Sequence, residues 1–146
     1  MCNLRDTYLQ NSRYRLTHSI LRRVLGIIAG VTPLTDVTGF GLLGHLIEVA
    51  DGSGVSARIY NDKIPVIPSV HEYLNLKCVP SGTNRNFASY GEKVSSMEKR
   101  QKNILCDPQT GGGLPVAVEP DSVSFVENVL KSHGIMSVVI GEIIPR

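Results

Sequence analysis

Apolar side chains recur at the spacing of helices in several stretches of the chain. Residues 17–29 and 121–132 each carry apolar positions three or four residues apart, the pattern of one buried helix face. Gly30 and Gly134 stand just beyond these runs as stops, and Asp121 is the expected cap of the second. The pattern predicts helices over residues 17–29, 70–76 and 121–132, and another that follows the glycine-spaced run 39–44 and ends near Ala50.

Extended segments lie between these predicted helices. Alternating or short continuous apolar runs predict strands over residues 34–38, 55–60, 114–118 and 135–140. A brief apolar strand is also expected to end at Cys106, as a buried thiol. Residues 79–94 are polar and rich in turn formers, so we expect a long irregular loop there. Strands that alternate with helices on short connections indicate one layered domain of the α+β or α/β class.

The composition is that of a globular protein about one domain in size. The chain has 146 residues, of which 42% are hydrophobic and 19% charged, so disorder is excluded as the main state. Its apolar stretches are far shorter than the roughly 20 residues of a membrane span. With 5% aromatic residues and no tryptophan, it lacks a stacking platform for single-stranded nucleic acid. We therefore expect neither a membrane nor a nucleic acid as its partner.

The net charge of +2 is unevenly distributed. Residues 1–30 hold five arginines and one aspartate, a net charge of +4, and the rest of the chain is mildly acidic. An arginine-rich start is compatible with a nucleic-acid arm, a mitochondrial transit segment or the polar face of a helix. Because no lysine run accompanies it, we expect residues 1–30 to be a basic peripheral segment that ends in a helix, and residues 31–146 to be the domain.

Cysteines and histidines are few and scattered. The three cysteines include no C-x-x-C pair and cannot pair completely within one chain, which favours a reducing compartment and a cytoplasmic location. The four histidines show no metal-ligand spacing, so a zinc site is disfavoured.

Asp36 is the most informative polar residue. It stands just before a glycine turn and a predicted helix, where a carboxylate can hold a hard cation such as Mg²⁺ while backbone N–H groups face phosphate oxygens. The same placement also suits an aspartate that only caps the turn or the helix. Asp107 precedes a proline and a triple glycine, so it suits either a loop that positions a ligand or a simple turn. His45 and Glu48 share one helix face without a third partner, which favours a structural role.

The spacing Gly39-x-Gly41-x-x-Gly44, with Asp62 about 20 residues further on, matches a dinucleotide-binding fingerprint. That fingerprint follows an apolar, fully buried parallel strand, whereas residues 31–36 include an acid, two threonines and a proline. The sequence therefore disfavours a dinucleotide-binding domain.

Three strings of residues carry the strongest signal in the chain. The first is Thr-Asp-Val-Thr-Gly-Phe-Gly-Leu-Leu-Gly-His at residues 35–45, the second is residues 82–91 and the third is residues 107–114. In order and spacing these strings, together with residues 140–143, resemble signatures of the selenide, water dikinase, or selenophosphate synthetase, family. The resemblance covers residues 31–146. It implies the C-terminal half of such an enzyme, with an α+β fold of the AIR synthase-related C-terminal domain type. In that fold, helices pack on a mixed β-sheet in three layers.

The resemblance also implies a homodimeric, magnesium-dependent enzyme that converts ATP, selenide and water to selenophosphate, AMP and phosphate, for selenocysteine synthesis. Asp36 matches the family's third magnesium-binding aspartate. The nucleophile, most ATP contacts and the other two magnesium-binding aspartates belong to the other half in this family, so we expect no catalytic residue here and no activity of the chain alone. The expected partner is an N-terminal half or a second copy, and the alternative is a non-catalytic dimerisation or interaction module.

Two positions depart from the family pattern in and just after the third string. Gly111 stands where the family usually has serine, and Pro115 stands where it usually has leucine. We expect the loop to be more flexible and its following strand to begin differently.

Overall fold

The computed structural model describes residues 2–8 and 25–146. The helix expected over residues 17–29 lies mostly outside the described residues. Leu25, the first described residue after the gap at residues 9–24, is fully buried in an apolar cluster.

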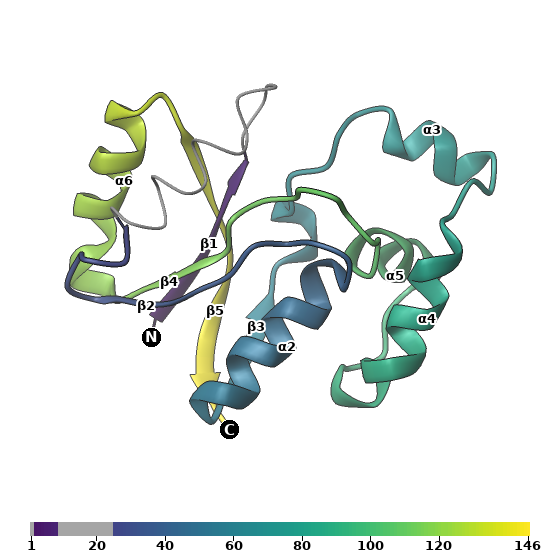
Figure 1. Cartoon of the computed structure of the whole chain (residues 1–146), viewed down its shortest axis with the longest axis horizontal. Helices are drawn as coiled ribbons and strands as arrows, with labels where there is room; N and C mark the ends of the chain where they lie inside the picture. Colours follow the sequence, from purple (N-terminus) through teal and green to yellow (C-terminus); the bar gives the residue numbers. More distant parts are fainter. Residues whose placement is uncertain (1, 9–24) are drawn as a thin grey trace.

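The described strands form one antiparallel sheet, around which the helices are arranged (Figure 1). Its order is β2-β4-β1-β5-β3, and all four strand pairings are antiparallel. The α+β class is confirmed, but the expected mixture of parallel and antiparallel strands is wrong for the part of the sheet that is described. The strands are β1 (Cys2–Tyr8), β2 (Val31–Leu34), β3 (Val55–Ile59), β4 (Val116–Val118) and β5 (Met136–Pro145).

Strand β1 lies in the middle of this sheet, although we expected residues 1–30 to be peripheral. Its backbone pairs with β4 on one side and β5 on the other, so that Leu4 stands opposite both Ala117 and Gly141. The pairing places residues 2–8 within the domain, and a division at residue 30 does not describe the sheet. A strand with polar residues reveals its central position only through its two partners.

The helices confirm part of the pattern read from the sequence. The helix expected after the glycine-spaced run 39–44 corresponds to α2 (Gly41–Ser53), which begins inside that run and extends past Ala50. The helices expected over residues 70–76 and 121–132 correspond to α3 (Val70–Asn75) and α6 (Val123–Ser132). Asp121 does not cap α6, because it lies in a 3-10 turn, η3 (Pro120–Ser122), that precedes the helix.

Two expectations for the segment between α3 and β4 are wrong. The expected irregular loop over residues 79–94 contains the helix α4 (Ser81–Tyr90), followed by a 3-10 turn, η2 (Gly91–Lys93). The expected strand ending at Cys106 is instead the end of α5 (Lys99–Leu105). Cys106 is nevertheless fully buried, as predicted.

Two apolar clusters cover opposite faces of the sheet. Val116 and Val118 of β4 pack in one cluster with Val126 and Leu130 of α6. Ala117, which points the other way along the same strand, belongs to the second cluster, formed mainly with residues of α2, α4 and α5. The described elements thus form three layers, with helices on both faces of the sheet.

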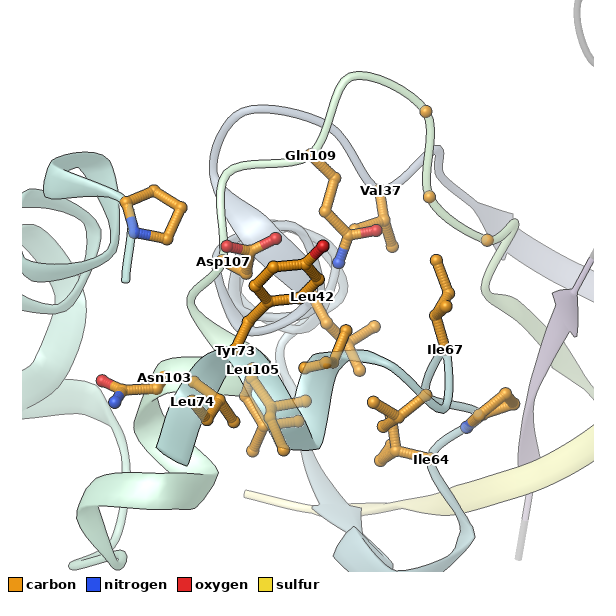
Figure 2. Close-up of a pocket in the computed structure, with 18 of the residues that line it drawn as sticks. Val37, Leu42, Ile64, Ile67, Tyr73, Leu74, Asn103, Leu105, Asp107 and Gln109 are labelled. Atoms are coloured by element: carbon orange, nitrogen blue, oxygen red, sulfur yellow. The ribbon is translucent and has the colours of Figure 1, made fainter. Parts of the chain in front are cut away.

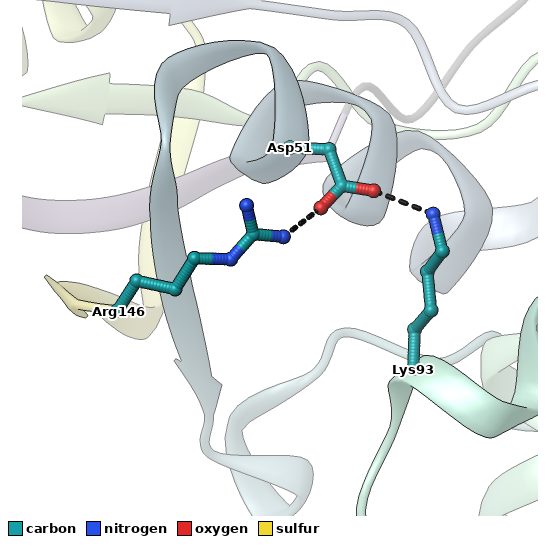
Figure 3. Close-up of polar contacts among 3 residues, drawn as sticks. All are labelled: Asp51, Lys93 and Arg146. Atoms are coloured by element: carbon teal, nitrogen blue, oxygen red, sulfur yellow. Dashed lines mark hydrogen bonds and ion pairs between the residues drawn. The ribbon is translucent and has the colours of Figure 1, made fainter.

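An ion-paired group joins three distant parts of the chain at the end of α2 (Figure 3). The Asp51 carboxylate accepts a hydrogen bond from Lys93 Nζ at 2.6 Å and another from the Arg146 guanidinium. The Lys93 hydrogen bond is the main cause that lowers the pKa of Asp51, and Arg146 adds to it. Because all three side chains are at least partly exposed to solvent, this group should be sensitive to salt.

Candidate functional site

Asp36 lies in the connection between β2 and α2, fixed from both sides by backbone hydrogen bonds. The Thr35 N–H donates to Pro115 O at 3.2 Å, and the Val37 N–H donates to Gly113 O at 3.0 Å. The side chain of Asp36 is half-buried, and its Oδ1 atom is inaccessible to solvent. The carboxylate is therefore carried on a backbone segment that runs along the glycine loop of the third string.

Two more hydrogen bonds join the first and third strings. The Gly112 N–H donates to Val37 O at 2.9 Å, and the Gln109 N–H donates to Thr38 O at 3.1 Å. Gly112 has little free space, since a Cβ there would lie 2.9 Å from Val37 Cβ. Gly111 differs, because a Cβ at this position would meet nothing within 4 Å. The serine usual in the family would therefore fit at position 111 without a clash.

Two of the three glycines of the first string are required by close packing, whereas a Cβ on Gly39 would meet nothing within 4 Å. Gly41 has φ +72°, and a Cβ there would lie 2.8 Å from the carbonyl carbon of Cys106. A Cβ on Gly44 would lie 2.9 Å from Cε1 of Tyr90. Strand β2, which precedes this turn, pairs antiparallel with β4, so the parallel βαβ setting of a dinucleotide fingerprint is missing among the described strands.

Helix α4, the second string, holds the other two together. The Asn86 side chain is buried, and its Nδ2 donates hydrogen bonds to Gly39 O at 2.8 Å and to Cys106 O at 3.0 Å. One turn further on, the Tyr90 hydroxyl donates to Phe40 O at 2.7 Å. Burial raises the pKa values of the Tyr90 hydroxyl and the Cys106 thiol, so both stay protonated at neutral pH. We call this set of bonds from α4 to the two loops the main-chain clamp.

In the structure His45 and Glu48 have a third partner, Thr38, which the sequence does not indicate. Thr38 Oγ1 and His45 Nε2 are joined by a hydrogen bond of 2.9 Å, and Nδ1 of the same ring lies 3.6 Å from Glu48 Oε2. His45 is buried, and its ring and that of Phe40 form a T-shaped pair with 5.9 Å between the ring centroids. His45 thus ties the Thr38 side chain to α2 and steadies the turn that follows Asp36.

A cavity of about 370 Å³ adjoins the third string. Figure 2 shows residues that line it. Asp107 and Gln109 line it from the loop after α5, and Tyr73 and Leu74 line it from α3. Burial raises the pKa of Asp107 above its ordinary value. Asp36 is not among the residues that line this cavity.

The chemistry of a magnesium site can be compared with the residues present. Asp36 offers one carboxylate of the hard-oxygen type that Mg²⁺ prefers. Within residues 25–146, however, no three His, Cys, Asp or Glu side chains gather closely enough to hold a metal ion. The described residues therefore fit one ligand of a shared site, whose other ligands would come from elsewhere.

Sequence reasoning identified Asp36, Asp107 and His45 but missed the residues that hold their loops. The sequence pattern predicts a loop at Asn86 and Tyr90, because the buried face of α4 carries almost no aliphatic side chains. The available signal was spacing alone, since the buried positions of α4 are Gly82, Thr83, Asn86 and Tyr90, three or four residues apart except for the first two.

The family model and the similar proteins below agree with each other. The AIR synthase related protein, C-terminal domain, family matches residues 4–146. A selenide, water dikinase of Haemophilus influenzae (strain 86-028NP) is 53% identical over 119 residues, which are 82% of this chain and 34% of that protein. A selenide, water dikinase of Photorhabdus laumondii is 50% identical over 116 residues, 80% of this chain and 33% of that protein. The chain thus spans about a third of the length of the curated relatives it matches.

Solved structures agree on the fold. The crystal structure of E. coli HypE superposes with a TM-score of 0.62 at 24% sequence identity, covering 88% of this chain and 33% of that one. At this identity the likeness concerns the fold alone. In the part of the chain that the structure describes, no helix has both the length and the apolar character needed to cross a bilayer.

Proposed function

The chain belongs to the AIR synthase related family as its C-terminal domain, and from this premise we propose that it works as the C-terminal domain of a selenide, water dikinase. The reaction proposed for the complete enzyme converts ATP, selenide and water to selenophosphate, AMP and phosphate. An N-terminal half supplies the nucleophile and most contacts to ATP. The cytoplasmic location and the homodimer belong to the same proposal.

One observation supports this proposal most directly: the three strings that resemble the family meet in one place. Backbone hydrogen bonds join residues 35–38 to residues 109–115, and the main-chain clamp of α4 holds both loops. A chance likeness in three separate strings would not require the folded chain to bring them into contact.

The role proposed for Asp36 is to contribute one carboxylate oxygen to a magnesium site shared with the N-terminal half. The bound ion would neutralise part of the polyphosphate charge. The residues of this chain position that carboxylate, because the N–H groups of Thr35 and Val37 fix the backbone on either side of it. His45 supports the following turn through Thr38.

Reconstitution from two halves tests the proposal. The purified chain is mixed with the separately produced N-terminal half of the Haemophilus influenzae relative, and AMP and selenophosphate are followed by chromatography and ³¹P NMR. We expect selenide-dependent AMP only from the mixture. AMP formation by the chain alone would show that it is catalytically competent without that half. A mixture that associates but forms no AMP would contradict the proposed activity.

Asp36→Asn tests the metal role, with Asp62→Asn as its matched control at an exposed acid of another loop. In the reconstituted mixture we expect Asp36→Asn to lose most magnesium-dependent turnover with unchanged thermal unfolding, and Asp62→Asn to keep it. As a readout separate from activity, Mn²⁺ added to the mixture should broaden the amide NMR signals of residues 35–38. Equal turnover and equal broadening in wild type and Asp36→Asn would refute the role.

A second candidate is a non-catalytic module that associates with a full-length relative. Phe40 favours it, because this large apolar side chain is 61% exposed at the tip of the turn after Asp36. Co-purification of the chain with a full-length relative, without a gain in activity, is the expected result for this candidate. Phe40→Ser should then weaken the association, and its failure to do so would exclude this surface.

A further inference from the structure

The cavity beside the third string borders the Asp36 loop at Val37, does not include Asp36 itself, and has a mostly apolar lining. Ile64, Ile67 and Leu74 contribute aliphatic side chains from the segment that includes α3, and Leu42 and Leu105 contribute them from the body of the domain (Figure 2). A volume of about 370 Å³ lies within the range of small-molecule sites. The walls therefore suit a small ligand with a largely apolar body.

The charge of the lining comes from a single carboxylate. Asp107 is the one charged side chain among the described residues that line the cavity, and none of them is a lysine, arginine or histidine. Within the described part of the chain, the Asp107 carboxylate has neither a hydrogen bond nor an ion pair. A partly buried carboxylate in this state attracts a donor group, and it repels an anion such as phosphate.

The polar groups near Asp107 complete the recognition chemistry. Gln109 lies on the same loop and also lines the cavity, with its side chain drawn beside Val37 in Figure 2. An amide oxygen and a carboxylate together can accept several N–H donors from one ligand. The ring of Tyr73 lines the cavity from α3 and offers a flat apolar face for a planar group.

We infer that this cavity binds a small organic cation with a flat apolar body, of the aromatic amidine or aromatic amine class. The ring occupies the space between α3 and the loop of the third string, and its N–H groups donate to the Asp107 carboxylate. This inference rests on the lining of the cavity and is independent of the proposed reaction. Its failure would leave the reconstitution experiment unaffected.

Three probes with one ring and different charge test the inference. Benzamidine is the cation, benzyl alcohol the neutral analogue and benzoate the anion, each titrated into the ¹⁵N-labelled chain. We expect benzamidine to shift the amide signals of Leu74, Gln109 and Gly112 with a millimolar dissociation constant. Benzyl alcohol should bind at least tenfold more weakly, and benzoate should produce no saturable shift at these residues.

Asp107→Asn separates charge recognition from filling of an apolar cavity. The variant has nearly the same shape, so we expect it to fold and to lose at least tenfold in benzamidine affinity. Asp62→Asn, at an acid outside the lining, is the control and should bind as wild type does. Leu74→Ala provides a second variant, which should weaken benzamidine through the lost apolar wall.

The opposite results would overturn the inference. They are the absence of saturable shifts with benzamidine, benzoate binding as tightly as benzamidine at the same residues, or an unchanged benzamidine affinity in Asp107→Asn.

Discussion

Replacement of Asn86 by alanine is the sharpest test of the main-chain clamp. The side chain donates two hydrogen bonds to main-chain carbonyls, at 2.8 and 3.0 Å, from a buried position. A neutral hydrogen bond contributes about 0.5–1.5 kcal/mol, and a buried acceptor left without a donor costs about 1–3 kcal/mol. Because Cys106 O loses its donor in a buried setting and Gly39 O loses one in a partly buried setting, we expect the free energy of unfolding to fall by about 2–4 kcal/mol.

The control is Asn84→Ala, the same substitution two residues earlier in α4. The Asn84 side chain is exposed, and its one hydrogen bond comes from Lys102 Nζ at 3.2 Å on the surface. Both variants gain the same helix propensity, about 0.5 kcal/mol, from the change to alanine. The difference between the two variants therefore isolates the buried bonds of Asn86.

Urea unfolding followed by circular dichroism measures both free energies. With a denaturant slope of about 1–3 kcal/mol/M for a small protein, the Asn86 variant should unfold roughly 1–2 M earlier than the Asn84 variant. Equal midpoints, within about 0.5 kcal/mol in free energy, would mean that the two carbonyls are satisfied in another way and would refute the clamp.

Three further predictions concern other parts of the domain. Gly41→Ala and Gly54→Ala both place a side chain at positive φ, which costs about 1–2 kcal/mol. A Cβ at 41 would also lie 2.8 Å from the Cys106 carbonyl carbon, whereas a Cβ at 54 would meet nothing within 4 Å. Thermal unfolding should therefore show the larger loss of stability for Gly41→Ala, and equal losses would contradict the close approach. Asp107 has a pKa raised by burial, so its folded state holds the proton more firmly and stability falls as pH rises from 3.8 through the raised value; Asp107→Asn should unfold at a higher temperature than wild type at pH 7, with the gap closing below pH 3.8, and a variant less stable at pH 7 would oppose this. Asp51 has a pKa lowered by its cationic partners, so its contribution is present above pH 3.8 and is lost as pH falls through the lowered value; Asp51→Asn should reduce stability in dilute buffer but much less in 1 M NaCl, and an effect that does not change with salt would argue against ion pairing.

Periodicity predicted those elements whose buried faces are apolar. The alternation in residues 55–60 predicts β3, and the spacing in residues 121–132 predicts α6 with Phe125, Val126, Val129 and Leu130 on one face. Val126 and Leu130 are buried as predicted, but Phe125 is 59% exposed. Helix α6 packs in one apolar cluster and Ile59 of β3 packs against the other, so burial and apolarity coincide in them.

The same reasoning failed where burial is polar or where a partner lies far away in the sequence. Helix α4 buries Thr83 and Asn86, and the groups that accept the Asn86 bonds lie on residues 39 and 106. Strand β1 depends on β4 and β5, more than 100 residues further along the chain. No local pattern contains such partners, and for the same reason the antiparallel sense of the sheet could not be derived from the order of elements alone.

For the candidate site, sequence reasoning identified the side chains but not their support. Asp36 was singled out from its place before a glycine turn, and the structure adds the bonded backbone beside it. For His45 the missing third partner was Thr38, seven residues earlier and on the other side of the turn. Helical spacing could not indicate this contact, because Thr38 does not belong to the helix.

The main-chain clamp has a consequence for how such domains can diverge. Asn86 and Tyr90 bind the carbonyl oxygens of residues 39, 40 and 106, and these atoms are present whatever side chains those positions carry. Mutations in the two loops can therefore alter what they recognise while their backbone course is retained. A grafting experiment that exchanges loop residues between distant members of the fold should for this reason keep the α4 residues of the recipient and vary only the side chains that point away from them.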